Sequence, residues 1–355
     1  MNHAAVAPLS TRVTAAMKRF LRDQSENGSL NWKDWFETYA RGRSLLGRLI
    51  NGHPDEIAFV KNTSEGVSLI ANGLRLGRGD VVLVAEPEFP SNVYPWLALE
   101  RRGVRVKWLA EDRGRVQIET IRRALRRRPK VLALSFVEFL SGFRNDLVTI
   151  GNLCAESGVF FCVDAIQGLG AFPVDVREAN ISALAGDGKK WLMGPEGAGF
   201  LYCSRDVFDR VDVTVHGWTS VKNPVDFFAR EIAYPESARR FEPGGLNTVG
   251  IHGLVAALEL VHEVGVTEIS ARLLALTGRL CAGLRSKGYR VLSPRGEGEG
   301  SGIVSFRHPR MNTDAIAERL QTATVVCANR MGYIRLSPHY YLTEEEIDRA
   351  VDALP

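Results

Sequence analysis

The residues of this chain best suited to covalent chemistry are an aspartate and a lysine, each next to an apolar run. Residues 159–163 are apolar and end in Asp164, a pattern typical of a strand buried on both faces of a parallel sheet. Asp164 would then lie at the carboxyl end of the strand, where open α/β sheets bind ligands. Residues 181–185 are also apolar and lead into a glycine-rich turn that contains Lys190. A lysine amine can form a Schiff base and a buried carboxylate can keep a pyridinium nitrogen protonated, which suits pyridoxal phosphate.

A helix start follows an earlier strand and offers groups for an anion. Residues 57–60 read as a short strand, and Asn62 and Glu65 are spaced as a capping box before an apolar helix. The amides and hydroxyls of Thr63 and Ser64 can hold a phosphate at the positive end of such a helix. The local pattern is equally compatible with a plain N-cap.

Other side chains have both a structural and a functional interpretation. Phe89 follows a buried strand and can be a core aromatic or a ring stacked on a cofactor. Gly244 and Gly245 can form an ordinary turn, or let the backbone approach a ligand closely. Arg335 can be a surface arginine, or a planar fork that binds a carboxylate with two hydrogen bonds.

The motif Asp164-x-x-Gln167, followed by Lys190-Trp191-Leu192-x-Gly194-Pro195-x-Gly197, resembles class V aminotransferases of fold type I. That family includes cysteine desulfurases, selenocysteine lyases and kynureninase-like enzymes, and the resemblance runs along nearly the whole chain. It implies pyridoxal 5'-phosphate as cofactor, a Schiff base on Lys190 and a salt bridge from Asp164 to the pyridine nitrogen. It also implies a homodimer with active sites at the interface.

The resemblance also implies roles around the cofactor. Thr63 and Ser64 lie where the family has the loop that binds the cofactor phosphate. Phe89 lies where relatives have the side chain that stacks on the cofactor ring. Many relatives have an asparagine where Phe139 stands, so contact with the ring hydroxyl is expected from Gln167. Gly244 and Gly245 match the segment that reaches the neighbouring subunit's cofactor phosphate.

Asp187 stands where many desulfurases have a phosphate-binding serine. A carboxylate there would repel a phosphate, so its expected partner is Lys189 or a backbone amide. Lys189 is the rival of Lys190 for the covalent role, but the spacing to Trp191 favours Lys190. The positive charge of Lys189 would help to lower the pKa of Lys190.

Four residues are expected to contact the substrate. Arg335 matches the family's arginine for the substrate carboxylate. His3 lies in a segment that resembles the N-terminal stretch crossing the active-site mouth, although the sequence alone favours a loose arm. His216 and Trp218 are weaker candidates, since a lone histidine is more often structural.

The predicted reaction depends on whether a nucleophilic cysteine precedes Arg335. Desulfurases need a nucleophilic cysteine on a mobile loop ahead of this arginine, whereas Cys327 is eight positions away in an apparent strand, residues 325–328. We therefore expect Cys327 to be a buried small hydrophobe. The prediction is an aminotransferase acting on a small α-amino acid. A cysteine or selenocysteine lyase, or an amino-acid epimerase, remains the alternative because each needs only Lys190 to move the proton.

The expected elements give an α/β fold of type I, with a mostly parallel seven-stranded sheet and a smaller C-terminal α+β domain. The predicted division is an arm at residues 1–15, a large domain at 16–248 and a small domain at 249–355. Expected helices cover residues 11–22, 32–50, 67–74, 146–157, 249–264 and 266–288, with a last helix after the capping box at 343–346. Expected strands cover residues 57–60, 81–85, 104–109, 131–136, 159–163, 290–292, 302–306, 325–328 and 333–337.

Composition excludes several other classes. Among 355 residues the net charge is only +4, which does not favour nucleic-acid binding. The five cysteines show no CxxC spacing, so neither a disulfide framework nor a metal site is expected. The chain opens without a signal-peptide pattern and has no apolar run of membrane-spanning length, so a cytoplasmic location is expected. A nicotinamide dehydrogenase is disfavoured because Gly168-Leu169-Gly170 lacks a third glycine, Pro173 standing there instead.

Overall fold

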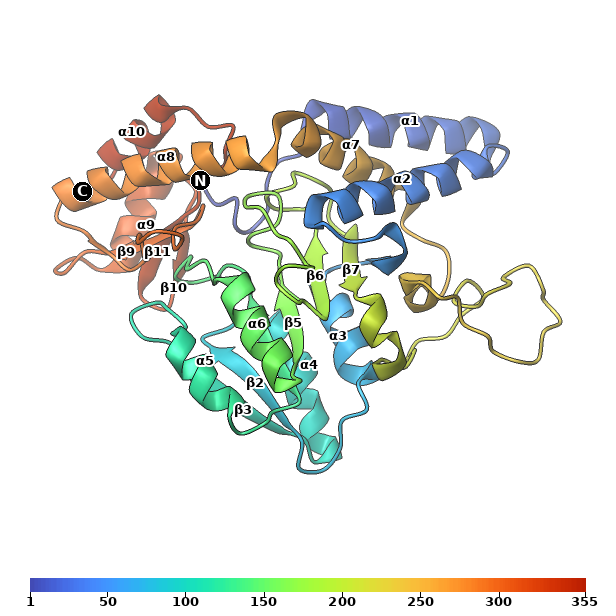
Figure 1. Cartoon of the computed structure of the whole chain (residues 1–355). Helices are drawn as coiled ribbons and strands as arrows, with labels where there is room; N and C mark the ends of the chain where they lie inside the picture. Colours follow the sequence, from blue (N-terminus) through green and yellow to red (C-terminus); the bar gives the residue numbers. More distant parts are fainter.

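A seven-stranded sheet forms the centre of the molecule in the computed structural model, which describes all 355 residues (Figure 1). Its strand order is β1-β7-β6-β5-β4-β2-β3, and only β7 runs opposite to the others, so the expected mostly parallel sheet is confirmed. The strands are β1 (Ile57–Val60), β2 (Val81–Glu86), β3 (Arg105–Ala110), β4 (Val131–Ser135), β5 (Phe160–Asp164), β6 (Ala183–Asp187) and β7 (Gly199–Cys203).

Two apolar layers cover the sheet, because successive side chains of a strand point to opposite faces. Phe160 belongs to one buried cluster and Phe161, the next residue of β5, to the other. Helix α3 (Thr63–Gly73) and the short α4 (Tyr94–Leu97) pack on the first side. Helices α5 (Ile118–Leu125) and α6 (Leu147–Ser157) pack on the second. The central strands are therefore buried on both faces, as their apolar runs predict.

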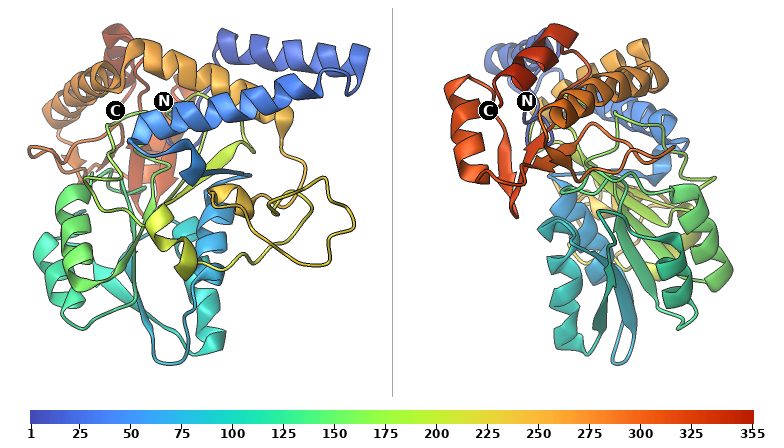
Figure 2. Two further views of the ribbon diagram at one scale, coloured as in Figure 1. Left: turned by 45° about the vertical axis from the view of Figure 1, so that its right-hand side comes forward. Right: turned by 90° about the vertical axis from the view of Figure 1, so that its left-hand side faces the viewer.

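Three long helices lie together beyond the sheet. Helices α1 (Thr11–Asn27) and α2 (Trp32–Ile50) pack on α7 (Thr248–Val264), as Figures 1 and 2 show. Helix α8 (Val266–Ser286) continues from α7 at an angle of 81° and leads into the C-terminal part. No single helix is both long and apolar enough to cross a membrane; α7 and α8 reach those limits only as a bent pair.

The C-terminal part is a four-stranded antiparallel sheet covered by α8, α9 (Thr313–Thr322) and α10 (Glu344–Asp352). Its strand order is β10-β11-β9-β8. The core of this part begins at Leu276, whereas α7 contributes side chains to the larger core. The strands are β8 (Arg290–Val291), β9 (Val304–Arg307), β10 (Ala328–Arg330) and β11 (Tyr333–Leu336).

Two local expectations differ from the structure. The strand predicted at residues 325–328 is wrong, since residues 325–327 are irregular and β10 begins only at Ala328. Val325 and Cys327 pack on the small core without strand pairing, whereas Val326 is exposed. The capping box predicted at Asn62 is half formed: the Asn62 side chain accepts from the amide of Glu65, but the Glu65 carboxylate accepts from the amide of Lys61. Short 3₁₀ helices occur at Pro54–Glu56, Pro90–Asn92, Ala98–Arg102, Arg205–Arg210 and Ala238–Phe241.

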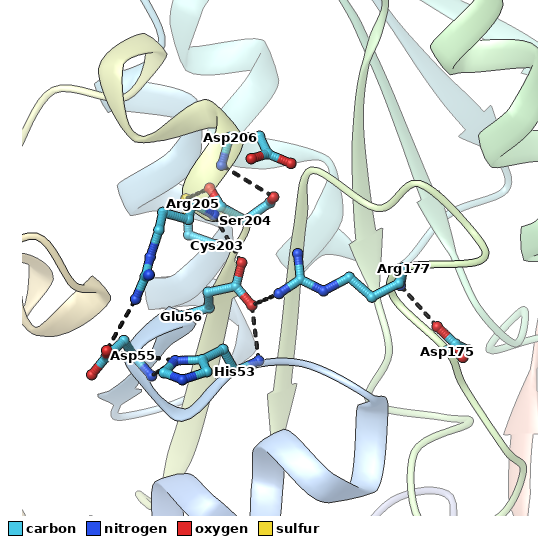
Figure 3. A network of polar contacts seen from close by, with 9 residues as sticks. All are labelled: His53, Asp55, Glu56, Asp175, Arg177, Cys203, Ser204, Arg205 and Asp206. Carbon is cyan, nitrogen blue, oxygen red and sulfur yellow. Dashed lines mark hydrogen bonds and ion pairs between the residues drawn. The ribbon is translucent and has the colours of Figure 1, made fainter.

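A buried carboxylate secures the amino-terminal edge of the sheet (Figure 3). Glu56 precedes β1 and is 1% exposed. Its carboxylate accepts from the backbone amides of His53 and Arg205, both at 2.9 Å, and pairs with the guanidinium of Arg177. These contacts tie the start of β1 to the end of β7 and to the segment that follows β5.

Candidate active site

A cleft lies at the carboxyl ends of β5 and β6, beside the start of α3 and next to the hairpin formed by β10 and β11. This is the edge where parallel α/β sheets bind ligands. The cleft brings together seven residues that the sequence singled out: Thr63, Ser64, Phe89, Gln167, Asp187, Lys190 and Arg335.

The two neighbouring lysines differ in their partners. The amine of Lys190 is buried and lies 5.7 Å from the centre of the Phe89 ring. Burial lowers the pKa of Lys190 to about 8, opposed by the charge of Asp164 and assisted by those of Arg335 and Lys189. The amine of Lys189 instead lies 2.9 Å from the Glu196 carboxylate. Burial therefore makes Lys190 a readily deprotonated nucleophile, whereas the amine of Lys189 is held in an ion pair.

Asp164 lies under the cleft at the end of β5 and is 1% exposed. One carboxylate oxygen accepts from the amide of Ile166 at 3.0 Å, and the other has no partner in the protein. Burial raises the pKa of Asp164 to about 6, whereas the amide of Ile166 and the charge of Lys190 oppose that rise. A cationic ring nitrogen would satisfy the free oxygen and restore an ionised carboxylate.

Two further buried acids lie behind Asp164, and sequence analysis assigned them no role. Glu88 accepts from the amides of Phe89 and Ser135 and from the Ser135 hydroxyl. Burial raises the pKa of Glu88 to about 7, and Asp164 adds to the rise. The pKa of Glu138 is also raised by burial and then by Glu88, and one of its oxygens has no partner. Glu88 was detectable because it follows β2 at the same sheet edge, but the neighbours of Glu138 depend on the folded chain.

The start of α3 presents polar groups to the cleft. The Thr63 hydroxyl is buried without a partner, and the Ser64 hydroxyl lies 2.7 Å from that of Ser91. The amides of Thr63 and Ser64 have no intrahelical acceptor because they lie in the first turn of α3, and the Asn62 side chain is already used by the amide of Glu65. This end of α3 suits a phosphate.

Asp187 is held by the lysine that the sequence suggested. Its carboxylate accepts from the amide of Lys189 at 3.4 Å and lies 3.9 Å from the Lys189 amine. Burial still raises the pKa of Asp187, while Lys189 opposes the rise. The second Asp187 oxygen forms no hydrogen bond.

Arg335 is held on the small-domain side of the cleft. It is 1% exposed and donates to the carbonyl of Phe139 at 2.7 Å, while its Nε has no partner. Burial, followed by the charge of Arg330, lowers the pKa of Arg335 to about 10, so the guanidinium stays charged at neutral pH. A free donor on a charged, buried group suits an anionic ligand.

The N-terminal segment is anchored beside the cleft, so the interpretation as a loose arm is wrong. Asn2 pairs with Ser337, and the amide of Ala4 donates to the Ser337 hydroxyl at 2.9 Å. Gln167 donates to the carbonyl of Ala4 at 2.9 Å. These partners are more than 160 positions apart in the chain, which explains why local sequence patterns missed them.

Five predicted site residues do not line the Lys190 cleft of their own chain. His3 contacts the carbonyl of Ser337 and the hydroxyl of Tyr341. His216 contacts Tyr234, and Trp218 is exposed. The substrate contacts of His3, His216 and Trp218, and the action of Gly244 and Gly245 on a neighbouring subunit, stay predictions. Those two glycines line a separate cavity with Lys61 and Glu65.

No cysteine lines the Lys190 cleft. Cys327 is half-buried against the core of the small domain, and burial raises the pKa of its thiol. A raised pKa leaves little thiolate, which is the nucleophilic form. The expected role as a small hydrophobe is consistent with this environment.

The residues of the cleft fit pyridoxal 5'-phosphate. The phosphate would lie at the start of α3, where the Thr63 hydroxyl has no partner. The ring would lie against Phe89, with its nitrogen toward the unpartnered oxygen of Asp164 and its aldehyde carbon toward Lys190. Bound there, the cofactor supplies an electron sink for bonds broken at the α-carbon of an amino acid.

Comparisons with known proteins agree with this assignment. The family model for class V aminotransferases matches residues 1–350. A probable cysteine desulfurase of Methanothermobacter thermautotrophicus is 29% identical, over 98% of this chain and 91% of that protein. An uncharacterized aminotransferase of Bacillus subtilis is 28% identical, over 91% of this chain and 85% of that protein.

The fold also matches solved structures of a cystine C–S lyase, C-DES. Its complex with cysteine persulfide has a TM-score of 0.91 at 24% identity and covers 100% of this chain and 97% of that one. A C-DES variant that carries glycine covalently linked to its pyridoxal phosphate has the same TM-score at 23% identity, over 99% and 94%.

Proposed function

Because this chain belongs to the class V aminotransferase family and is a pyridoxal 5'-phosphate enzyme, we propose that it is a C–S lyase. Its substrate is a small α-amino acid with sulfur at the β-carbon. The observation that carries the proposal is the cleft itself: Lys190 is buried with a lowered pKa, Arg335 is available for a carboxylate, and no cysteine is present to carry a persulfide.

Each residue has a task in this reaction. Arg335 binds the α-carboxylate and fixes the orientation of the α-carbon. The neutral amine of Lys190 removes the α-proton, for which a pKa of about 8 is well matched to neutral pH. With the cofactor bound, Asp164 would hold a proton on the ring nitrogen, and Phe89 would support one face of the ring. The electrons of the broken C–H bond form a double bond between the α- and β-carbons, and the sulfur leaves the β-carbon as a thiolate with the electrons of the C–S bond.

The absence of a cysteine from the cleft separates this proposal from a desulfurase that passes sulfur to a protein thiol. Sulfur leaves the cleft as a small molecule instead. The relatives named as cysteine desulfurases support chemistry at sulfur. The aminotransferase predicted from the sequence is the second candidate, which the family description and the Bacillus subtilis relative support.

We also propose a homodimer. The segment between β7 and α7 projects from the body of the molecule (Figure 2). Within this segment Phe227 is 77% exposed and Phe228 is 92% exposed. Exposed aromatic side chains of this kind favour a protein contact. Gly244 and Gly245 lie on the same segment, so a partner subunit bound there would contact them. Sedimentation at micromolar concentration tests the dimer.

The reaction is tested with the cofactor-loaded protein and its Lys190→Ala and Lys189→Ala variants. We expect wild type and Lys189→Ala to release pyruvate from cysteine or cystine, with the visible band of the cofactor restored unaided. Lys190→Ala should release none. A band that bleaches and returns only when a keto acid is added would identify an aminotransferase. If wild type binds no pyridoxal phosphate, both proposals fail.

A further inference from the structure

A second arginine faces the cleft beside Arg335. Arg330 on β10 lines the cleft together with Arg335 on β11. In the antiparallel register Arg330 pairs with Tyr333 and Ala328 with Arg335. The side chains of two paired residues point to the same face of a sheet. The side chains of residues two apart on one strand also point to the same face. Arg330 and Arg335 are therefore diagonal neighbours on one face, with Cα atoms about 7–8 Å apart.

Arg330 is not neutralised by the protein. It forms neither an ion pair nor a side-chain hydrogen bond, although it is only partly exposed. Lys189, by contrast, is paired with Glu196 and Asp187. The acids of the cleft thus lie on the large-domain side, whereas the small-domain side carries two unneutralised guanidinium groups. One α-carboxylate accounts for only one of them.

We propose that Arg330 binds a second acidic group on the substrate, and that among α-amino acids with sulfur at the β-carbon the enzyme prefers those whose side chain ends in a carboxylate or a sulfur acid. This inference rests on the proposed function, since it assumes that Arg335 binds the α-carboxylate. Arginine suits the task because its planar fork can form two parallel hydrogen bonds with an acidic group. Arg330 is thus a specificity-determining residue of the cleft.

The alternative partner of Arg330 is the cofactor phosphate. The protein groups that suit a phosphate, however, are the hydroxyls of Thr63 and Ser64 and the start of α3. All of these belong to the large domain. Arg330 belongs to the hairpin that also provides Arg335. The hairpin position favours the substrate, and the experiment below separates the two ligands.

The experiment compares acids with amides of nearly the same size in the cofactor-loaded protein. Dissociation constants are measured from the initial change in visible absorbance for aspartate against asparagine, glutamate against glutamine, and cysteine sulfinate against asparagine. The variants are Arg330→Gln, Arg335→Gln and Arg307→Gln. Arg307 is the matched control, because it lies on the same sheet but stacks on Tyr333 and does not line the cleft.

We expect at least one acid to bind roughly tenfold to hundredfold more tightly than its amide. Arg330→Gln should reduce that ratio to about one and leave the amide's affinity unchanged. Arg307→Gln should keep the wild-type ratio, and Arg335→Gln should weaken acid and amide alike. Whether the carboxylates or the sulfinate show the larger ratio identifies the acidic group.

The proposal is overturned if no acid binds more tightly than its amide in wild type, or if Arg330→Gln leaves the ratio unchanged. It is also overturned if Arg330→Gln weakens pyridoxal phosphate binding instead, which would assign Arg330 to the phosphate. When neutral amino acids still change the absorbance, only this inference fails. When no amino acid changes it, the proposed function fails as well.

Discussion

Buried carboxyl groups lie at both edges of the seven-stranded sheet, and their surroundings differ. At the amino-terminal edge, the oxygens of Glu56 are satisfied by two backbone amides and Arg177 (Figure 3). At the carboxyl edge, Asp164 and Glu138 each keep an oxygen without a partner, and the pKa of each is raised by burial. A satisfied buried acid stabilises a fold, whereas the unpartnered oxygen of Asp164 is available to a ligand and that of Glu138 costs stability.

The largest expected effect comes from removing the charge at the carboxyl edge. Asp164→Asn keeps the shape but cannot hold a proton on the ring nitrogen, so α-proton removal should slow about 10²- to 10³-fold. Exchange of the α-proton of an amino acid with deuterated water, followed by NMR, measures this step directly. A loss below threefold would show that Asp164 does not act on the cofactor.

The same substitution at the two edges should change stability in opposite directions. Glu56→Gln removes the charge paired with Arg177 and turns an acceptor into a donor facing a backbone amide, so we expect a loss of about 2–3 kcal/mol. Glu138→Gln removes a carboxyl whose pKa burial raises. A raised pKa means that the wild-type protein loses stability as pH rises and the carboxyl ionises, so the amide, which cannot ionise, should make the protein more stable than wild type at pH 8.

Urea unfolding of the cofactor-free variants at pH 8 measures both changes. Circular dichroism at low urea checks that each variant has the wild-type fold. The comparison between the two edges is wrong if Glu56→Gln and Glu138→Gln shift the unfolding midpoint in the same direction.

A smaller and graded effect is expected from pH. Burial lowers the pKa of Lys190 to about 8, so its neutral amine should become available as pH rises through that value. Below about pH 8 the rate of cofactor capture should rise close to tenfold per pH unit, and above it the rate should level off. N-acetyl-lysine, measured in parallel, should continue to accelerate toward pH 10 because its amine is solvated. Parallel profiles for protein and N-acetyl-lysine would contradict a lowered pKa.

Local patterns in the sequence determined most of the strands and long helices, together with the positions of Asp164 and Lys190. Those residues were predictable because an apolar run ending in an acid, or in a glycine-rich turn with a lysine, is a short-range signal. The roles of Arg335, Phe89 and Gln167 came from the family resemblance instead. Their side chains lie in the cleft, as that resemblance implies.

Only the tertiary structure decided which side chains surround those residues. The anchoring of Ala4 by Gln167, the position of Glu138 behind Glu88 and Asp164, and the arrival of Arg330 beside Arg335 depend on chain segments brought together by folding. These contacts depend on strand register and on how the domains pack, and neither produces a periodic pattern in the local sequence. The chain alone therefore specified the reacting groups, whereas folding decided what kind of ligand they face.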